Sequence, residues 1–185
     1  YKTIKNECQN IEIINVIDPI VKRITTCNDT YTVGVIGTKR TINSDIYPQK
    51  IKSINQNIRV KSLATPLLAA MIEEGFFNDK ISQAIVHNYL KDPALEAIDK
   101  LILACTHYPL IQDVIRSFYP HEIDIIDSAS HVAFHIKEVL SNKQLLATQS
   151  HKHRFYVSDY THSFEKSAKF FFGEDIHLEE ISFIQ

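Results

Sequence analysis

Cysteine is scarce in this 185-residue sequence, and no apolar run approaches the ~20 residues that a bilayer-spanning helix needs. The three cysteines, Cys8, Cys27 and Cys105, form an odd set without metal-ligand spacing. This pattern excludes a disulfide-stapled scaffold, argues against a structural zinc site and favours a reducing compartment. A basic segment followed by an apolar leader is also missing, so we expect no association with a membrane.

An excess of charge of either sign is missing as well. Twenty basic and 22 acidic residues give a formal net charge of −2 and a pI of about 6.5. This balance creates no strong field for phosphate backbones, so we expect no nucleic-acid partner. The hydrophobic content of 44% excludes a disordered chain, and the length suffices for about one domain or slightly more.

Segments typical of strands and of helices alternate along the chain. We expect strands over residues 11–18, 31–37, 58–63, 101–104, 123–127, 154–158 and 178–183. We expect helices over residues 19–26, 39–55, 65–75, 80–90, 109–118, 128–140 and 163–172. The alternation implies crossover connections, so the predicted fold class is α/β, with a mostly parallel sheet flanked by helices. Residues 101–104 are wholly apolar, which predicts a central strand buried on both faces.

The most informative polar cluster follows that central strand. Ligands of parallel α/β sheets bind at the carboxyl ends of the strands, and Cys105, Thr106 and His107 lie at this point, just before Pro109. A helix N-terminus beside the thiol should lower its pKa, His107 could orient or tune the thiol, and Thr106 could bind an anion. The cluster therefore predicts a proton-transfer site. The alternative is that Cys105 is a small core residue.

Other polar residues permit two interpretations each. Thr38 and Thr41 follow an earlier strand and could bind a carboxylate or simply cap the next helix. Glu73 lies late in a predicted helix and could polarise a thiol or an imidazole, or face solvent. His131 and His135 share a helix face without a third ligand, so we expect no metal site.

The stretch Leu-Ile-Leu-Ala-Cys-Thr-His-Tyr-Pro-Leu-Ile at residues 101–111 resembles the C-terminal active-site motif of glutamate racemases, within the aspartate/glutamate racemase superfamily. Further segments that resemble this family occur in the family's order. They lie at residues 33–47, 66–75, 125–129 and 155–158. The resemblance therefore covers nearly the whole chain.

This resemblance implies a cytoplasmic, cofactor-independent enzyme that interconverts L- and D-glutamate and supplies D-glutamate for peptidoglycan. It further implies a homodimer, in which two pseudo-symmetric α/β domains each give one cysteine to a cleft, so that a thiolate removes the α-proton on one face and a thiol protonates the other. By the match, the catalytic residues are Cys105, His107 and Glu73, and the substrate-binding residues are Thr106, His107, Thr38 and Thr41.

The sequence departs from the family at the first catalytic cysteine, which stands in a Cys-Asn-Thr motif after an early strand. Residues 27–30, Cys-Asn-Asp-Thr, imitate this motif but follow a predicted helix, so we interpret them as a decoy. The sequence begins with Tyr1, and we expect that an N-terminal part is missing and that the 185 residues alone are inactive. A smaller departure is Thr65, where the family commonly has a cysteine before proline, and we expect it to alter packing rather than chemistry.

The predicted organisation follows from this alignment. Residues 1–20 would be the C-terminal end of a truncated first domain, and residues 21–140 would form one complete Rossmann-like or flavodoxin-like domain. Residues 141–185 would be a tail returning to the first domain. The alignment thus predicts one whole α/β domain and the remnant of its pseudo-symmetric counterpart.

Two alternative functions stay open. The chain could belong to a racemase or decarboxylase that acts on another acidic substrate, because the Cys-Thr-His motif is shared more widely than the substrate preference. It could also be a non-catalytic half-protein that binds a partner through its exposed cleft face. A Cys-Asn-Thr motif encoded upstream would favour the enzyme.

Overall fold

A computed structural model describes residues 2–8, 10–26, 29–77, 79–149, 152–173 and 176–182. The chain divides into two compact units, Tyr1–Leu145 and Leu146–Gln185. We call them the main unit and the C-terminal unit, and describe each separately.

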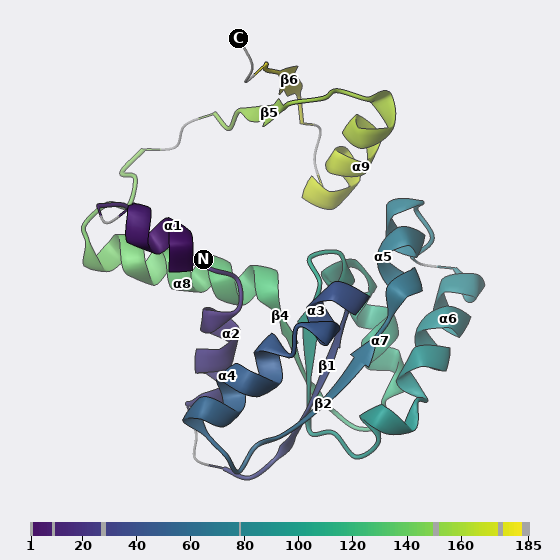
Figure 1. The fold of residues 1–185 in the computed structure, drawn as a ribbon. Helices are drawn as coiled ribbons and strands as arrows, with labels where there is room; N and C mark the ends of the chain where they lie inside the picture. The colour runs from purple at the N-terminus through teal and green to yellow at the C-terminus, as the bar shows by residue number, and fades with distance from the viewer. Residues whose placement is uncertain are drawn as a thin grey trace. The chain divides into compact units, whose positions relative to one another are not determined.

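The main unit is built on a four-stranded, wholly parallel sheet with the order β2-β1-β3-β4 (Figure 1). Its strands are β1 (Thr32–Gly37), β2 (Arg59–Ala64), β3 (Lys100–Ala104) and β4 (Asp124–Asp127). The predicted α/β class, with a parallel sheet flanked by helices, is confirmed. Strand β3 lies between β1 and β4, and Leu101, Ile102 and Leu103 are fully buried, as expected for a central strand.

Helices cover both faces of this sheet. The main unit contains α1 (Lys2–Glu7), α2 (Asp18–Thr25), α3 (Lys39–Asn43), α4 (Ile46–Ile54), α5 (Pro66–Glu73), α6 (Lys80–Leu90), η1 (Pro93–Leu95), η2 (Tyr108–Ile111), α7 (Gln112–Phe118) and α8 (Ser128–Asn142). Figure 1 shows α2 and α4 on one side of the sheet and α5, α6 and α7 on the other.

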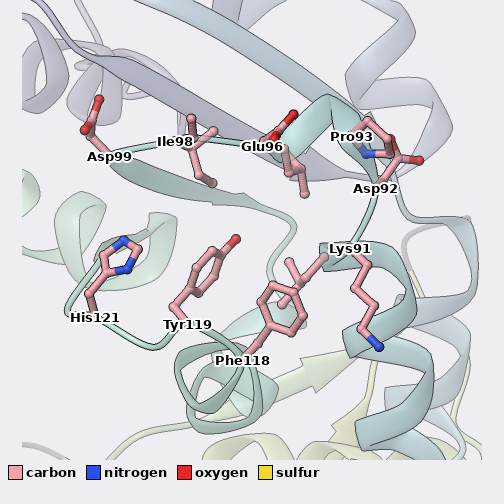
Figure 2. Close-up of a pocket in the computed structure, with 12 residues that line it drawn as sticks. Lys91, Asp92, Pro93, Glu96, Ile98, Asp99, Phe118, Tyr119 and His121 are labelled. Atoms are coloured by element: carbon pink, nitrogen blue, oxygen red, sulfur yellow. The ribbon is translucent and has the colours of Figure 1, made fainter.

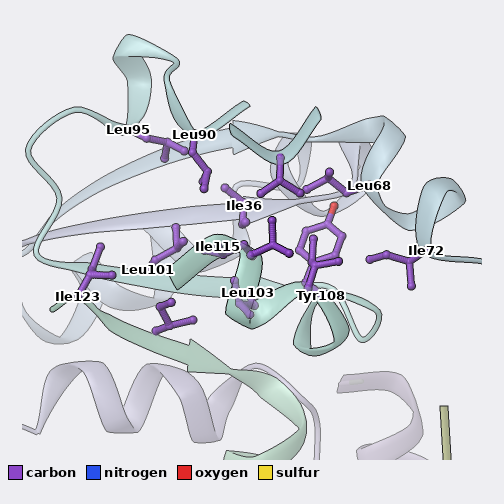
Figure 3. Packing of buried hydrophobic residues seen from close by; sticks show 14 of the residues in the cluster. Ile36, Leu68, Ile72, Leu90, Leu95, Leu101, Leu103, Tyr108, Ile115 and Ile123 are labelled. Atoms are coloured by element: carbon purple, nitrogen blue, oxygen red, sulfur yellow. The ribbon is translucent and has the colours of Figure 1, made fainter. Parts of the chain in front are cut away.

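Alternating strand residues divide the core into two clusters. Leu101 and Leu103 belong to the first core cluster, which packs against α5, α6 and α7 (Figure 3). Ile102, which lies between them in sequence, points to the opposite face and belongs to the second core cluster, with α2 and α4. This period of two follows from the pleat of the strand.

Local signals fix the helix ends close to where the sequence predicts them. Asp79 accepts hydrogen bonds from the backbone N–H groups of Ile81 and Ser82 in a capping box, so α6 begins at Lys80. Gly75 follows the end of α5 with φ of +85°, a conformation that glycine adopts without strain. The helix expected over 39–55 is instead two helices, because Asp45 adopts a left-handed backbone conformation with φ of 53° between them.

The strand predicted over residues 11–18 is wrong. Residues 11–17 form neither strand nor helix, and no described strand pairs with them. A strand needs a neighbour to satisfy its backbone groups, and here Asn15 takes over part of this role. Its side-chain oxygen accepts hydrogen bonds from the N–H groups of Ile17 and Asp18, at the point where α2 begins.

The C-terminal unit is a small strand-helix-strand element. Strand β5 (Phe155–Val157) pairs in parallel with β6 (Leu178–Glu180), and α9 (His162–Phe172) connects them. Thr161 accepts a hydrogen bond from the N–H of Phe164 at the start of α9, and Gly173 ends the helix with φ of +77°. The last predicted strand is confirmed but ends at Glu180, and Phe183 lies outside the described residues.

Candidate active site

Three loops meet at the carboxyl edge of the main sheet because the strands end in register. Gly37 pairs with Ala64 on one side and with Ala104 on the other. The next residues, Thr38, Thr65 and Cys105, therefore follow three neighbouring strand ends. A Cβ atom at Gly37 would lie 3.2 Å from the carbonyl oxygen of Ala104, so a glycine lets these strands end close together.

A thiol, an imidazole and a carboxylate form a row at this edge. Cys105 Sγ lies 3.6 Å from His107 Nδ1, and His107 Nε2 lies 2.9 Å from Glu73 Oε1. Thr106 Oγ1 lies 3.5 Å from the same Nδ1. With a proton on Nε2 facing the carboxylate, Nδ1 presents its lone pair to the thiol. His107 can therefore accept a proton from the Cys105 thiol at Nδ1 and return it.

The local fold brings these three groups together from two segments. Cys105 and His107 lie in the tight turn after β3, where the N–H of Tyr108 donates to the carbonyl oxygen of Cys105. Glu73 is the last residue of α5, which packs in the first core cluster with the η2 turn. The Glu73 carboxylate thus contacts His107, while the Glu73 side chain is also 56% exposed to solvent.

The expected lowering of the Cys105 pKa is wrong. Burial raises the pKa of the Cys105 thiol, hydrogen bonds from the backbone of His107 and Tyr108 lower it, and the negative charge of Glu73 raises it further. The net direction is upward. The helix predicted over 109–118 in fact opens as the η2 3₁₀ turn, and α7 begins only at Gln112, so the thiol does not sit at an α-helix N-terminus.

Replacing Glu73 by glutamine is expected to accelerate alkylation of Cys105. Glu73→Gln removes a negative charge that disfavours the thiolate, so the pKa of Cys105 falls and its thiolate fraction at pH 8 rises. We expect the iodoacetamide rate at pH 8 to rise by about twofold or more. Peptide mass spectrometry separates Cys105 from the other cysteines. Glu74→Gln, in the exposed neighbouring residue, is the control, and an unchanged rate in Glu73→Gln would contradict the electrostatic role.

Thr38 and Thr41 lie at the same edge of the sheet, where Thr38 caps α3 and Thr41 lies within that helix. Thr38 Oγ1 accepts a hydrogen bond of 3.3 Å from the N–H of Thr41, and the two hydroxyl oxygens are 3.1 Å apart. The capping interpretation is therefore confirmed. The two hydroxyl groups lie side by side near the end of β1, where they could also bind a carboxylate.

The remaining candidates do not assemble into a metal centre. His131 Nδ1 lies 2.9 Å from the carbonyl oxygen of Asp127, and His135 Nδ1 lies 3.9 Å from a Glu138 oxygen. The part of the chain that the structure describes contains no group of three or more His, Cys, Asp or Glu residues that could hold a metal ion. The decoy motif cannot be placed, because Cys27 and Asn28 lie outside the described residues.

One pocket in the described part of the main unit lies at the opposite edge of the sheet. It has a volume of about 570 Å³ and is lined by the end of α6, the η1 turn, the residues before β3 and the segment after α7 (Figure 2). Its lining contains charged, apolar and aromatic side chains but no cysteine, serine or threonine. The pocket therefore contains no thiol for the proton transfer that the sequence predicts, and Cys105 is not among its lining residues. No described helix is long and apolar enough to cross a membrane.

The sequence analysis missed two buried residues beneath the row. Tyr108 and Thr65 are both fully buried, and their hydroxyl oxygens are 2.7 Å apart. The only signal for Tyr108 was its place inside the 101–111 motif, and Thr65 was noted only as a packing change.

Comparison with known proteins gives a consistent set of relatives, although no protein-family model matches the sequence. A glutamate racemase of Persephonella marina is 37% identical over 175 residues, which cover 95% of this chain and 65% of the relative. A glutamate racemase of a Sulfurihydrogenibium species is 33% identical over 171 residues, which cover 92% of this chain and 64% of the relative. The chain thus spans about two thirds of the length of these curated relatives.

Solved structures agree with these sequence matches. The glutamate racemase of Francisella tularensis, crystallised with D-glutamate, is 34% identical with a TM-score of 0.86, covering 98% of this chain and 68% of that one. A glutamate racemase isoform of Bacillus anthracis is 31% identical with a TM-score of 0.87, and the match covers 98% of this chain and 69% of that one. An aspartate racemase homologue of Pyrococcus horikoshii, at 24% identity and a TM-score of 0.52, shares the fold alone.

Proposed function

Because this chain belongs to the glutamate racemase family, we propose that it supplies one half of an active site that interconverts L- and D-glutamate. The observation that carries the proposal is the row of Cys105, His107 and Glu73 at the carboxyl edge of the sheet. The chemistry is proton transfer at the α-carbon of an amino acid, which needs an acid and a base but no redox or group-transfer step.

Each group of the row has a task in this proposal. Glu73 orients His107 through Nε2, so that Nδ1 can take the proton of Cys105 once substrate is bound, and before that the negative charge of Glu73 keeps the thiol protonated. The thiolate then removes the α-proton from one face of the substrate. In the reverse direction the Cys105 thiol donates a proton to the carbanion-like centre, and its raised pKa keeps this acid protonated until substrate arrives.

Hydroxyl groups nearby are proposed to hold the substrate. Thr106 flanks Cys105, while Thr38 and Thr41 lie at the end of the neighbouring strand β1. Hydrogen bonds from these groups to the substrate carboxylates would orient the α-carbon between the two faces of the site. They would also stabilise the negative charge that develops on the α-carboxylate when the proton leaves.

A two-base reaction needs a second acid/base on the opposite face of the substrate. We propose that a second cysteine, from a domain outside these 185 residues, supplies it, consistent with the chain's coverage of about 65% of its curated relatives. The 185 residues alone are then inactive. The complete enzyme would be a cytoplasmic homodimer that works without a cofactor and supplies D-glutamate for peptidoglycan.

Glutamate is favoured over other acidic substrates by the pattern of similarity. The four relatives named above at 31–37% identity are glutamate racemases. A racemase or decarboxylase of another acid, or a non-catalytic binding protein, therefore has less support.

The complete source protein is expected to racemise L-glutamate without added cofactor. Its N-terminal sequence is determined first, and the formation of D-glutamate is then followed by chiral chromatography, with L-aspartate as the comparison substrate. Equal activity on aspartate would overturn the assigned substrate. If the folded, complete protein racemises neither acid, the alternative of a non-catalytic protein that binds a partner is favoured.

A further inference from the structure

A buried hydrogen-bonded hub ties together the three strand ends that carry the candidate site. The Tyr108 hydroxyl donates to the carbonyl oxygen of Thr65 over 3.1 Å and lies 2.7 Å from Thr65 Oγ1. Thr65 in turn donates to the carbonyl oxygen of Gly37, from its backbone N–H at 2.9 Å and from its hydroxyl at 3.3 Å. The hub thus connects the end of β1 with the residues that follow β2 and β3.

The hub lies wholly inside the protein. Tyr108 and Thr65 have 0% exposed surface, and Figure 3 shows the Tyr108 ring within the first core cluster with its hydroxyl on the side of Leu68. Burial raises the pKa of Tyr108 far above its ordinary value, so the phenol stays protonated. The hydroxyl is therefore a fixed hydrogen-bond donor and does not exchange protons with substrate.

The two residues of the hub stand next to the two segments that form the row. Thr65 directly precedes α5, and Glu73 is the last residue of that helix. Tyr108 directly follows His107. A short, regular helix transmits a displacement of its first turn to its last, so the anchoring of Thr65 fixes where the Glu73 carboxylate meets His107 Nε2, at 2.9 Å. A loss of the hydroxyl contact would let α5 and the Cys105 loop separate.

We propose that Tyr108 and Thr65 are positioning residues of the racemase reaction, whose paired hydroxyls set the spacing between His107 and Glu73. This inference rests on the proposed function. The hub touches no reacting atom, and its effect on the reaction passes through the imidazole and the carboxylate. A small displacement of such a pair lowers a reaction rate strongly, because catalysis depends on sub-ångström placement.

Tyr119 provides a matched control within the same unit. Its hydroxyl is also buried, and burial raises the pKa of Tyr119 to about 12, but this oxygen has no hydrogen-bond partner among the described residues. Tyr108→Phe and Tyr119→Phe each remove one buried phenolic oxygen. Only the first removes a link between the strand ends, so a general effect of losing a hydroxyl is separated from the effect of losing the hub.

The first experiment measures kcat and KM of the complete protein well below its unfolding temperature. We expect Tyr108→Phe and Thr65→Val each to lower kcat about tenfold or more with KM changed less than about twofold. The double variant should lose less kcat than the product of the two single losses, because both changes remove the shared contact between the Tyr108 and Thr65 hydroxyls. Thr65→Ser, which keeps the hydroxyl, and Tyr119→Phe should retain wild-type kcat.

Folded Tyr108→Phe protein with wild-type kcat would overturn the inference, as would a rise in KM alone. If the wild-type protein does not racemise glutamate, the proposed function fails. A second measurement then still tests whether the hub sets the position of Glu73 relative to His107 and Cys105. Glu73→Gln is introduced into both wild-type and Tyr108→Phe backgrounds, and the pH dependence of Cys105 alkylation is compared. We expect a smaller effect of Glu73→Gln in the Tyr108→Phe background. An equal effect in both backgrounds would show that the hub does not position the carboxylate.

Discussion

Replacing Cys105 by alanine in the complete protein is expected to lower the rate of glutamate racemisation by about 10²–10⁴-fold or more. In the proposed mechanism the Cys105 thiol is the acid/base that meets the substrate, and His107 lies between this thiol and Glu73. The folded state should survive, because Cys105 is partly exposed and its side chain is small. Chiral chromatography of the product measures the rate.

The control for this prediction is another cysteine of the same unit. Cys8 is a free, partly exposed thiol in the segment after α1, and Cys8→Ala should leave the rate unchanged. Deuterium exchange sharpens the test. If a second base acts on the opposite face, Cys105→Ala protein in D₂O should still exchange the α-proton of one enantiomer without inverting it. Racemisation at the wild-type rate by Cys105→Ala protein would remove Cys105 from the mechanism.

Replacing Leu103 by alanine is expected to lower the free energy of unfolding of the main unit by about 2–5 kcal/mol. Leu103 is fully buried in central strand β3, within the first core cluster (Figure 3). The loss combines the hydrophobic transfer of the removed methyl groups with the cavity left behind. Folded domains are stable by only roughly 5–15 kcal/mol, so this is a large share of the total. Urea denaturation followed by far-ultraviolet circular dichroism measures the change.

An exposed residue gives the matched control for Leu103. Ile81 lies in α6 and is 64% exposed, so Ile81→Ala removes little buried surface and places a better helix former in the first turn. We expect the urea concentration at the midpoint of unfolding of Ile81→Ala protein to stay close to that of the wild type. If Leu103→Ala and Ile81→Ala unfold at the same urea concentration, strand β3 does not lie at the centre of the core.

The parallel sheet could be predicted from the sequence because its signals are local and agree with one another. Residues 101–104 are apolar without a break, and such a short run is typical of a strand covered on both faces. The segment 80–90 has an Asp at its start and helical spacing, and α6 matches these bounds. Each of these signals concerns residues that are neighbours along the chain or share one element.

The features that the sequence could not predict depend on contacts between distant segments. Residues 11–17 have strand-like composition, but composition cannot show whether a neighbouring strand is present. The direction of the Cys105 pKa depends on burial and on Glu73, which lies 32 residues earlier in the sequence. The hub of Tyr108 and Thr65 joins residues that are 43 positions apart. Only the folded chain brings such groups together.

The strand order also has a consequence for how the chain folds. Central strand β3 begins at Lys100, and its register with β1 pairs Val33 with Lys100, so the two are 67 positions apart. Loops of this length must close before the pairing stabilises anything, and folds dominated by such non-local pairings form slowly, in roughly milliseconds to seconds. During synthesis, β1 and β2 emerge well before β3. Until then one edge of β1 is an unpaired template for another chain, so nascent chains that end before β3 should aggregate more readily than chains that include Ala104.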